Sequence, residues 1–346
     1  MRISMPLQYA GEPKAAVDQV AELEKAGLDT VWVAEAYGYD SPTLMGYLAA
    51  RTERVTIGSA ILPMYSRTPT LIAMTAAGLD YLSDGRAVLG LGASGPQVIE
   101  GFHGIPYTKP LGRTRETIEI CRKVWAREER LTHDGKVFQL PLPPEQGTGL
   151  GKPLKIINHP VRPEIPIFVA SLGEKNVEMT AEIANGWLPH LFIPEKAEGV
   201  WGGFLAKGKA KRDPKLGELE ISAGGLLAIG EGEETKKLLE FTRPMIALYV
   251  GGMGAKGKNF YNTVAQRYGY EEAAEKIQDL YLAGKKDEAA AAVPDEFVEL
   301  TNLVGPESYV RERVEAFRAA GVTQLNVTPV GDNPAKLIEK VKEWAS

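Results

Sequence analysis

Residues 54–98, RVTIGSAILPMYSRTPTLIAMTAAGLDYLSDGRAVLGLGASGPQV, contain two apolar runs separated by a helix-like segment. The runs are Thr56–Leu62 and Ala87–Ser94, and Pro69–Leu82 between them has the length and composition of a helix. Continuous apolar runs separated by helices are typical of parallel strands that helices bury on both faces. This stretch therefore predicts two successive strand–helix units of an α/β fold.

The same alternation extends over the rest of the chain. Further strands are predicted at Arg2–Leu7, Thr30–Glu35, Ile165–Ser171, Gly186–Pro189, Ile221–Ile229 and Gln324–Pro329. Further helices are predicted over about Pro13–Ala26, Pro42–Thr52, Leu111–Glu128, Glu174–Ala184 and Pro334–Ala345. Eight strand–helix units with no composition shift that would mark a linker predict a (β/α)8 TIM barrel, formed as a single domain over residues 1–346.

Two segments interrupt this regular pattern and are interpreted as insertions, at about residues 130–166 and 231–305. In the first, THDGKVFQL carries an Asp-Gly pair between short runs, which predicts a β-hairpin. The second is helical, charged and rich in glycine, and we interpret it as the seventh helix plus a helical insertion. Its GGMGAKGK stretch, Gly251–Lys258, is either a lid over the site or a flexible surface loop.

Composition limits the kinds of partner. The formal charge of −5 provides no basic field, so neither a nucleic acid nor a membrane is expected as partner, and a small molecule is. Cys121 is the only cysteine, which excludes an intrachain disulfide and is consistent with a reducing cytosol. No apolar run approaches the roughly 20 residues that span a bilayer. We therefore expect a soluble cytoplasmic protein, and no metal site, because the histidines lack ligand spacing.

Gly90, Gly92 and Gly95 form a literal G-x-G-x-x-G after a predicted strand. A dinucleotide-binding unit also needs a strand that ends in an acidic residue about 20 residues further on. That position falls near Glu116, inside a predicted helix. The glycines instead predict a backbone that a phosphate or planar ring can approach closely, with Ser94 and Gln97 as additional hydrogen-bond donors.

Residues that can carry chemistry follow other predicted strands, and in a barrel the carboxyl ends of the strands form the site. Glu35 and Tyr37 follow the second strand, and Glu35 either exchanges protons with a substrate or cofactor or ties down a neighbouring strand. Ser171 ends the fifth strand, where it and the following amides either bind a phosphate or cap the next helix. His190 follows the sixth strand, and Tyr65 follows the third.

These features resemble the bacterial luciferase-like superfamily, in particular its branch of oxidoreductases that use the deazaflavin coenzyme F420. The resemblance rests on AGLDTVWVAEAYGYD (Ala26–Asp40), on residues 54–98 and on IPIFVASLGEKNVEMTAEIANGWLPH (Ile165–His190). It implies a (β/α)8 barrel with insertions, no metal, and hydride transfer between C5 of the deazaflavin and a small organic substrate. It also implies a homodimer.

The resemblance also implies roles for particular residues. A non-proline cis peptide is expected at Ser59–Ala60, beside the cofactor ring. Gly92, Ala93, Ser94, Gly95 and Gln97 would flank the ring, Ala170, Ser171, Leu172 and Gly173 would receive the phosphate, and Glu35 would lie near the cofactor. Relatives that oxidise glucose 6-phosphate have a glutamate where this chain has Pro96–Gln97 and a histidine where it has Ala36–Tyr37. That difference argues against the sugar phosphate as substrate.

The acid–base group has several candidates, and the function has two alternatives. The acid–base group, if one is required, is Glu35, Tyr37, Tyr65 or His190. The main alternative function is that of an FMN-dependent monooxygenase of the same superfamily, because the barrel and its phosphate site serve both cofactors. An alternative of another class is a non-catalytic protein that binds a flavin or deazaflavin.

Overall fold

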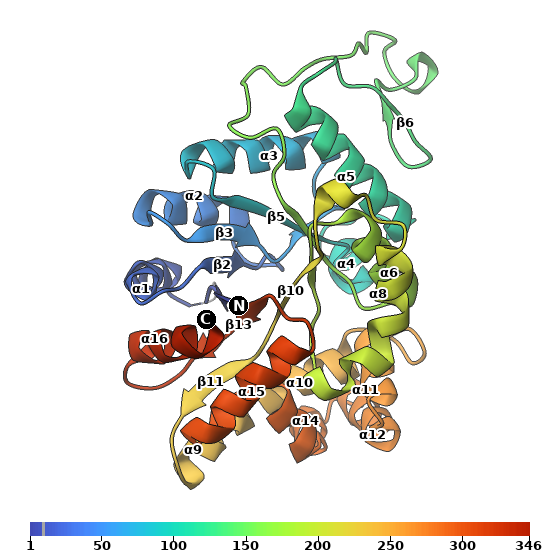
Figure 1. Ribbon diagram of the computed structural model, residues 1–346. Coiled ribbons are helices and arrows are strands. Elements are labelled where there is room, and N and C mark those ends of the chain that lie inside the picture. The colour runs from blue at the N-terminus through green and yellow to red at the C-terminus, as the bar shows by residue number, and fades with distance from the viewer. Residues whose placement is uncertain (9–10) are drawn as a thin grey trace.

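Eight parallel strands form a closed ring at the centre of the computed structural model, which describes residues 1–8 and 11–346 (Figure 1). In ring order, they are β3 (Thr56–Ser59), β2 (Thr30–Val33), β1 (Arg2–Pro6), β13 (Gln324–Asn326), β10 (Glu220–Ala223), β9 (Gly186–Leu188), β8 (Ile167–Ala170) and β5 (Ala87–Gly92). The pairing of β3 with β5 closes the ring. Each strand overlaps one of the eight predicted runs, and β10 begins one residue before its run, so the predicted (β/α)8 TIM barrel is confirmed.

Helices surround the strands, and the predicted ones begin and end within two residues of their expected bounds. They are α1 (Pro13–Lys25), α2 (Ser41–Arg51), α3 (Pro69–Leu82), α5 (Pro110–Ala126), α6 (Glu174–Ile183) and α16 (Pro334–Ala345), joined by α15 (Glu307–Ala319). Local signals fix where they begin, because a proline at the first helical positions gives up no hydrogen bond. The Asp40 and Thr68 side chains also accept backbone N–H groups at the starts of α2 and α3.

Two pairs of a large and a small residue fill one half of the barrel interior. Trp32 is paired in register with Gly58, where an added Cβ would lie 2.2 Å from the indole ring. Phe168 is likewise paired with Gly186, where a Cβ would lie 2.1 Å from the phenyl ring. The two rings lie 5.2 Å apart and are buried together with Val88. The glycines are therefore required because the barrel must hold these two rings.

The opposite half of the interior is polar. Ser4 on β1 and Ser222 on β10 are buried, with their hydroxyl oxygens 3.3 Å apart. The Ser4 hydroxyl also donates to Oδ1 of Asn326 on β13, at 3.2 Å. The barrel therefore has an apolar side at β2, β3, β5, β8 and β9 and a hydrogen-bonded side at β1, β10 and β13.

A β-bulge interrupts the pairing of the third and fourth barrel strands. Gly58 pairs with Val88 and Leu62 pairs with Leu91, so one strand has an extra residue. The cis peptide lies within this bulge, at Ala60–Ile61. The prediction of Ser59–Ala60 was wrong by one bond, because Ser59 still pairs with Val33 in the regular ladder.

The Ser59 hydroxyl replaces the ladder bonds that the bulge interrupts. It donates to the Gly90 carbonyl oxygen at 2.8 Å and accepts from the Gly90 N–H at 2.9 Å. Ser59 is fully buried, so no water reaches these groups from outside. This side chain therefore joins β3 to β5 at the point where their backbones separate.

The seventh predicted strand, Ile221–Ile229, is two strands rather than one. After β10 the chain leaves the barrel at Gly224 and continues as β11 (Leu226–Ile229), which pairs with β12 (Leu303–Gly305) and β14 (Thr328–Pro329). A Cβ on Gly224 would lie 2.2 Å from the Asn326 carbonyl oxygen. The chain therefore leaves the barrel at a point where its backbone contacts that of Asn326. The interpretation of residues 231–305 as helical was wrong for β12, whose pairing depends on strands distant in sequence.

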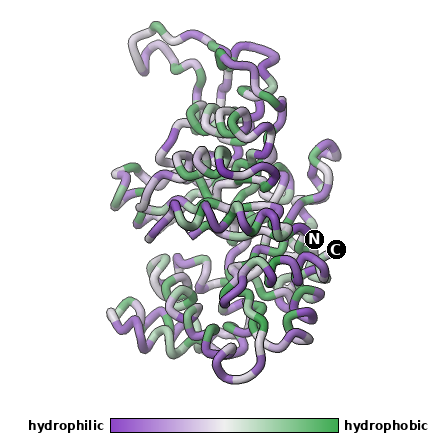
Figure 2. The backbone as a smooth tube through the Cα atoms, turned by 90° about the vertical axis from the view of Figure 1, so that its left-hand side faces the viewer, coloured by the Kyte–Doolittle hydropathy of each residue, from purple (hydrophilic) through white to green (hydrophobic). Residues whose placement is uncertain are grey.

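The first insertion contains the predicted hairpin, formed by β6 (His133–Asp134) and β7 (Gln139–Leu140), and it projects beyond the barrel (Figures 1 and 2). Glu116 on α5 holds its turn by accepting the backbone N–H groups of residues 136–138 and contacting the His133 ring at 3.2 Å. Burial acts to raise the pKa of Glu116, but the hydrogen bonds from Phe138 and His133 outweigh it and leave that pKa lowered. The acidic residue thus anchors a hairpin.

The second insertion is a group of helices at one side of the barrel (Figure 1). It contains α9 (Glu233–Lys237), α10 (Arg243–Ala247), α11 (Phe260–Arg267), α12 (Glu271–Leu282), α13 (Lys286–Ala291) and α14 (Asp295–Leu300). The glycines that begin the GGMGAKGK stretch pack against Tyr281, because a Cβ on Gly251 or Gly252 would lie 2.5 or 2.4 Å from it. The Asn259 side chain also donates to the Tyr249 and Val250 carbonyl oxygens. The glycine-rich stretch is therefore held at both its ends.

Replacing Ser59 by alanine is expected to lower the free energy of unfolding by about 1–3 kcal/mol, because the buried Gly90 N–H and carbonyl oxygen lose their partner. Urea unfolding followed by circular dichroism measures this. Ser308→Ala, at an exposed position of α15, is the control, with an expected change within about 0.5 kcal/mol. Equal stability of the two variants would contradict the bridging role of the hydroxyl.

Candidate functional site

The structure brings the predicted site residues to one end of the barrel, which we call the mouth. Glu35 and Tyr37 follow β2, Ala60 follows β3, and His190 follows β9. Ala93, Ser94 and Gly95 follow β5, Gln97 lies in α4 (Pro96–Gly101), and Ala170, Ser171, Leu172 and Gly173 end β8 and lead into α6. These are all carboxyl ends of parallel strands, where barrels carry their sites.

The floor of the mouth is apolar. Ala60 and Leu188 pack on the buried cluster of Trp32, Val88 and Phe168. Close packing explains why two residues at the end of the fourth barrel strand are glycines. A Cβ on Gly90 would lie 1.8 Å from the Ser59 carbonyl oxygen, and one on Gly92 would lie 2.8 Å from the Ile61 side chain. Both glycines are therefore required by the bulge, whatever binds above it.

Glu35 is buried at the mouth and holds an ion pair with Arg67. The guanidinium donates to both carboxylate oxygens, at 3.0 Å for Oε2, and the Ser41 N–H donates to Oε2 at 2.8 Å. These bonds join the loop after β2 to the segment that leads into α3. Of the two roles expected for Glu35, the contacts are those of a residue that ties neighbouring segments together. Sequence reasoning did not identify Arg67.

Tyr37 lies at the rim of the mouth, with 69% of its surface exposed. Its ring centroid is 6.3 Å from that of Phe102, which is exposed as well and follows α4. The phenol therefore lies outside the buried part of the site, among aromatic side chains that surround its entrance.

His190 lies between aromatic rings. Its ring centroid is 4.1 Å from that of Tyr249 and 5.8 Å from that of Tyr261, and both tyrosines come from the second insertion. The His190 Nε2 atom is closed off from solvent and has no hydrogen-bond partner within residues 1–8 and 11–346. Burial lowers the pKa of His190 to about 4. The ring is thus neutral at pH 7 and suited to hydrogen bonding rather than to general-acid catalysis.

The end of β8 offers backbone N–H groups rather than a hydroxyl. The Ser171 hydroxyl is 2.8 Å from that of Thr180 on α6, and the Trp187 indole N–H donates to the Ser171 carbonyl oxygen. Gly173 precedes α6, and its carbonyl oxygen accepts the Asn176 and Val177 N–H groups, which leaves the N–H groups of Glu174 and Lys175 as the donors at this helix start. Such a helix start binds anions. Phe260 of α11 lies beside it, 2.9 Å from where a Cβ on Gly173 would be.

Two polar residues at the mouth, Tyr107 and Asn326, were not among those predicted from the sequence. The Tyr107 hydroxyl donates to the Ser94 carbonyl oxygen at 3.2 Å, and its ring stacks on Tyr65 at 4.9 Å. Tyr65 is itself engaged, donating to the Thr108 carbonyl oxygen. Asn326 is at the end of β13, and the alternation of polar and apolar residues in Gln324–Asn326 is the one pattern that identifies it as facing inward.

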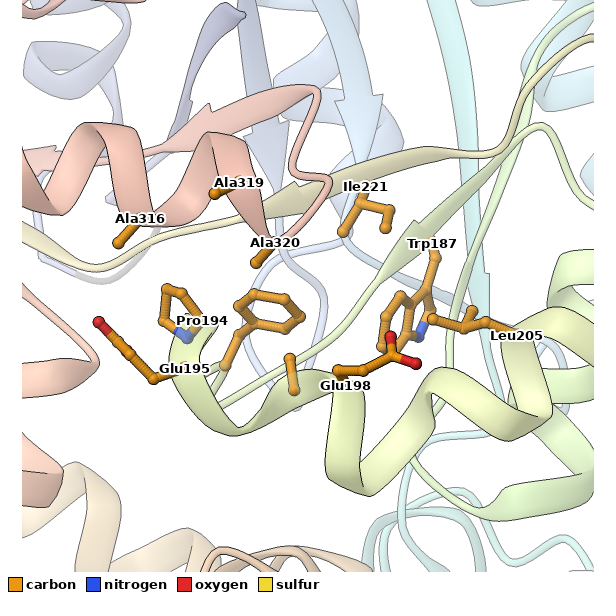
Figure 3. Close-up of a pocket in the computed structure, with 11 residues that line it drawn as sticks. Trp187, Pro194, Glu195, Glu198, Leu205, Ile221, Ala316, Ala319 and Ala320 are labelled. Atoms are coloured by element: carbon orange, nitrogen blue, oxygen red, sulfur yellow. The ribbon is translucent and has the colours of Figure 1, made fainter.

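A cavity of about 400 Å³ lies outside the mouth, between the barrel wall and its helices (Figure 3). Trp187 and Ile221 of β9 and β10 face it, opposite Ala316, Ala319 and Ala320 of α15, and Pro194 and Glu195 of α7 (Pro194–Ala197) lie beside them. No predicted site residue lines this cavity. The candidate site is therefore defined by the strand ends and not by this hollow.

Two further properties concern the described residues as a whole. Across residues 1–8 and 11–346, no group of three or more His, Cys, Asp or Glu side chains is arranged to hold a metal ion. Within the same residues, no helix combines the length and apolar character that crossing a membrane requires.

The fold is that of the luciferase-like TIM-barrel enzymes. Residues 1–324 match the family described as luciferase-like monooxygenase, and the chain belongs to that family. A protein of Mycobacterium tuberculosis, named provisionally as a coenzyme F420-dependent oxidoreductase, is 42% identical over 332 residues, which are 95% of each chain. The predicted resemblance is thereby confirmed, and the family consists of enzymes.

Solved structures agree in fold. The coenzyme F420-dependent tetrahydromethanopterin reductase of Methanopyrus kandleri superposes with a TM-score of 0.77 at 23% identity, over 98% of this chain and 96% of its own. The oxygenating constituent of 3,6-diketocamphane monooxygenase from Pseudomonas putida, in complex with FMN, has a TM-score of 0.65 at 18% identity, over 100% and 98%. The two neighbours, one described as F420-dependent and the other in complex with FMN, thus share this barrel.

Replacing Glu35 by alanine is expected to lower the free energy of unfolding by about 3–5 kcal/mol, because Arg67 is left as a buried charge without its partner. Adding Arg67→Met should recover part of this loss, since it removes the charge. Asp18→Ala, which breaks the exposed pair with Arg51, is the control, with an expected loss below about 1 kcal/mol. Urea unfolding compares the variants, and similar losses for Glu35→Ala and Asp18→Ala would refute the structural role.

Proposed function

We propose that this enzyme is a coenzyme F420-dependent oxidoreductase that transfers a hydride between C5 of the deazaflavin and a small organic substrate. The observation that carries the proposal is the 42% identity, over 95% of both chains, to the mycobacterial relative named for that cofactor. The substrate is taken to lie above the ring, inside the mouth, where the protein orients it and keeps water away.

The chemistry of the mouth fits this cofactor. The apolar floor formed by Ala60 and Leu188 suits a planar ring, and the start of α6 suits a phosphate. In this proposal Gly92, Ala93, Ser94, Gly95 and Gln97 flank the ring, with Ser59 supporting them through the bulge. Ala170, Ser171, Leu172 and Gly173 receive the phosphate, through backbone N–H groups. When bound, the coenzyme supplies a hydride donor or acceptor at C5.

Three of the four acid–base candidates, Glu35, Tyr37 and His190, then have different roles in the proposal. Glu35 keeps its ion pair with Arg67 and positions the loop beside the cofactor. Tyr37 contacts whatever enters the mouth, since its ring is exposed at the rim. His190 acts as a hydrogen-bonding group, because its low pKa leaves it without a proton to transfer at pH 7.

Fluorescence titration of the purified chain with coenzyme F420 and, separately, with FMN tests the choice of cofactor. Saturable binding of F420 at micromolar concentration, and much weaker binding of FMN, is the expected result. Tight binding of FMN without binding of F420 would overturn the proposal and favour an FMN-dependent monooxygenase.

Replacing Gly173 by aspartate is expected to weaken F420 binding at least about tenfold, because the new carboxylate occupies the helix start that the phosphate needs. Helix α6 should remain stable, since aspartate is a favourable capping residue, Gly173 has extended backbone angles, and the exposed Phe260 ring can turn away from the added Cβ. Gly173→Asn is the matched control, with the same shape but no charge. If both variants bind F420 equally, the phosphate is not held at this helix.

We further propose that the enzyme is a homodimer whose two copies meet at α2 and α3. Leu71, Met74, Tyr81 and Leu82 expose 46%, 54%, 69% and 62% of their surfaces along α3. Gly46 on α2 and Gly78 on α3 leave open space, because a Cβ on either would meet nothing within 4 Å. An exposed apolar face with gaps that allow close approach suits a second copy of the same face.

Replacing Met74 by glutamate is expected to convert the dimer to a monomer, because two charges would be buried at the two-fold axis. Light scattering after size exclusion measures the mass. Phe241→Glu, at a side chain that is 77% exposed but lies in the second insertion, should leave the mass of wild type unchanged. A monomeric wild-type chain would refute the proposed interface.

A further inference from the structure

We infer that His190, Tyr249 and Tyr261 form the wall of the mouth against which the substrate binds. This wall is built for an uncharged, planar organic molecule that carries a hydrogen-bonding group. The inference rests on the proposed function, and it names the class of substrate that the same site takes. Hereafter these three residues are called the aromatic wall.

The aromatic wall joins two segments that lie far apart in the sequence. His190 follows the sixth barrel strand, whereas Tyr249 lies in a helical turn of the second insertion and Tyr261 is the second residue of α11. The centroids of the two tyrosine rings are 4.7 Å apart, and His190 lies within 4.1 and 5.8 Å of them. Phe260, which precedes Tyr261 in α11, lies against Gly173 at the start of α6. One end of α11 therefore borders both the proposed phosphate position and the wall.

The Nε2 atom of His190 is the group that a ligand would satisfy. It is closed off from solvent and has no hydrogen-bond partner among the residues that the structure describes. Buried polar atoms are almost always paired, and one left unpaired costs about 1–3 kcal/mol. A substrate that brings a carbonyl or hydroxyl group to this atom recovers that free energy. The ring then positions the substrate by a hydrogen bond.

Two members of the aromatic wall, His190 and Tyr261, carry no charge at neutral pH. Burial lowers the pKa of His190 to about 4, and burial together with the nearby phenols of Tyr249 and Tyr107 raises that of Tyr261. Within residues 1–8 and 11–346, the titratable side chains whose rings contact His190 are Tyr249 and Tyr261. A carboxylate or phosphate placed here would be desolvated without a counter-charge, whereas an apolar ring stacks favourably. The wall therefore selects against anions.

A matched pair of probes tests the inference: benzaldehyde, which is uncharged and planar, and 4-carboxybenzaldehyde, which adds one negative charge. Binding to the F420-loaded chain is followed by saturation-transfer NMR and by the fluorescence of the bound coenzyme. We expect benzaldehyde to bind at least about tenfold more tightly than its carboxylate. Equal binding of the two probes would overturn the inference.

Variants identify the residue responsible. His190→Phe should weaken benzaldehyde binding about tenfold, whereas His190→Gln, which keeps a hydrogen-bonding group, should retain most of it. The affinity for F420 should stay within about twofold in both variants, since the wall faces the substrate. His159→Phe, at an exposed histidine of the first insertion, is the control. Unchanged benzaldehyde binding in His190→Phe would overturn the role of the ring.

The probes are also titrated into the chain without coenzyme, so that the two proposals can fail separately. A chain that does not bind F420 but still prefers benzaldehyde through His190 overturns the proposed function and keeps the wall. A chain that binds F420 but shows no preference keeps the function and removes the wall.

Dependence on pH gives a second readout. The preference for benzaldehyde should be constant between about pH 5.5 and 8, and a change centred near 6.5 would mean that His190 titrates as a solvated histidine. The pKa of His190 is about 4 in the folded chain, whereas an ordinary histidine in the unfolded chain has a pKa of about 6.5. Below about pH 6.5 the unfolded chain therefore binds more protons than the folded chain. Stability conferred by His190 is therefore present above pH 6.5 and falls towards pH 4, and His190→Gln should remove that slope.

Discussion

The two hydrogen bonds between the Ser59 hydroxyl and the backbone of Gly90 hold together the part of the barrel on which its mouth depends. At this point the third strand carries an extra residue and its backbone moves away from the fourth strand. Without a side chain to bridge the gap, buried N–H and carbonyl groups would lack partners. The bulge that results presents Ala60 and Ile61 to the mouth, and it requires glycine at positions 90 and 92.

The charged and the uncharged residues of the mouth have different roles. The buried carboxylate of Glu35 is fully engaged with Arg67 and Ser41, so its contacts fix the shape of the loops around the entrance. On the other side, His190 and its tyrosines are uncharged and rest against the insertion. The helix start after β8 provides N–H groups for an anion between them. A proposed cofactor with one planar end and one anionic end matches this division.

The second insertion shapes the site through contacts as well as through its length. Its glycines pack against Tyr281, and Asn259 holds the turn that precedes α11. These bonds fix the position of Phe260 over Gly173 and of Tyr261 against His190. The outer cavity of Figure 3, by contrast, lies behind Trp187 and is lined by none of these groups.

The sequence by itself determined the barrel and the end at which the candidate site lies. Apolar runs and proline-initiated helices are local patterns, so all eight strands and the bounds of helices such as Pro69–Leu82 follow from neighbouring residues. Only the tertiary structure decided how the site residues are used. The partner of Glu35 is 32 residues away, the rings against His190 come from the insertion, and β11 pairs with two strands, β12 and β14, that lie far from it in the sequence. These contacts depend on which segments the closed barrel brings together, and no local pattern carries that information.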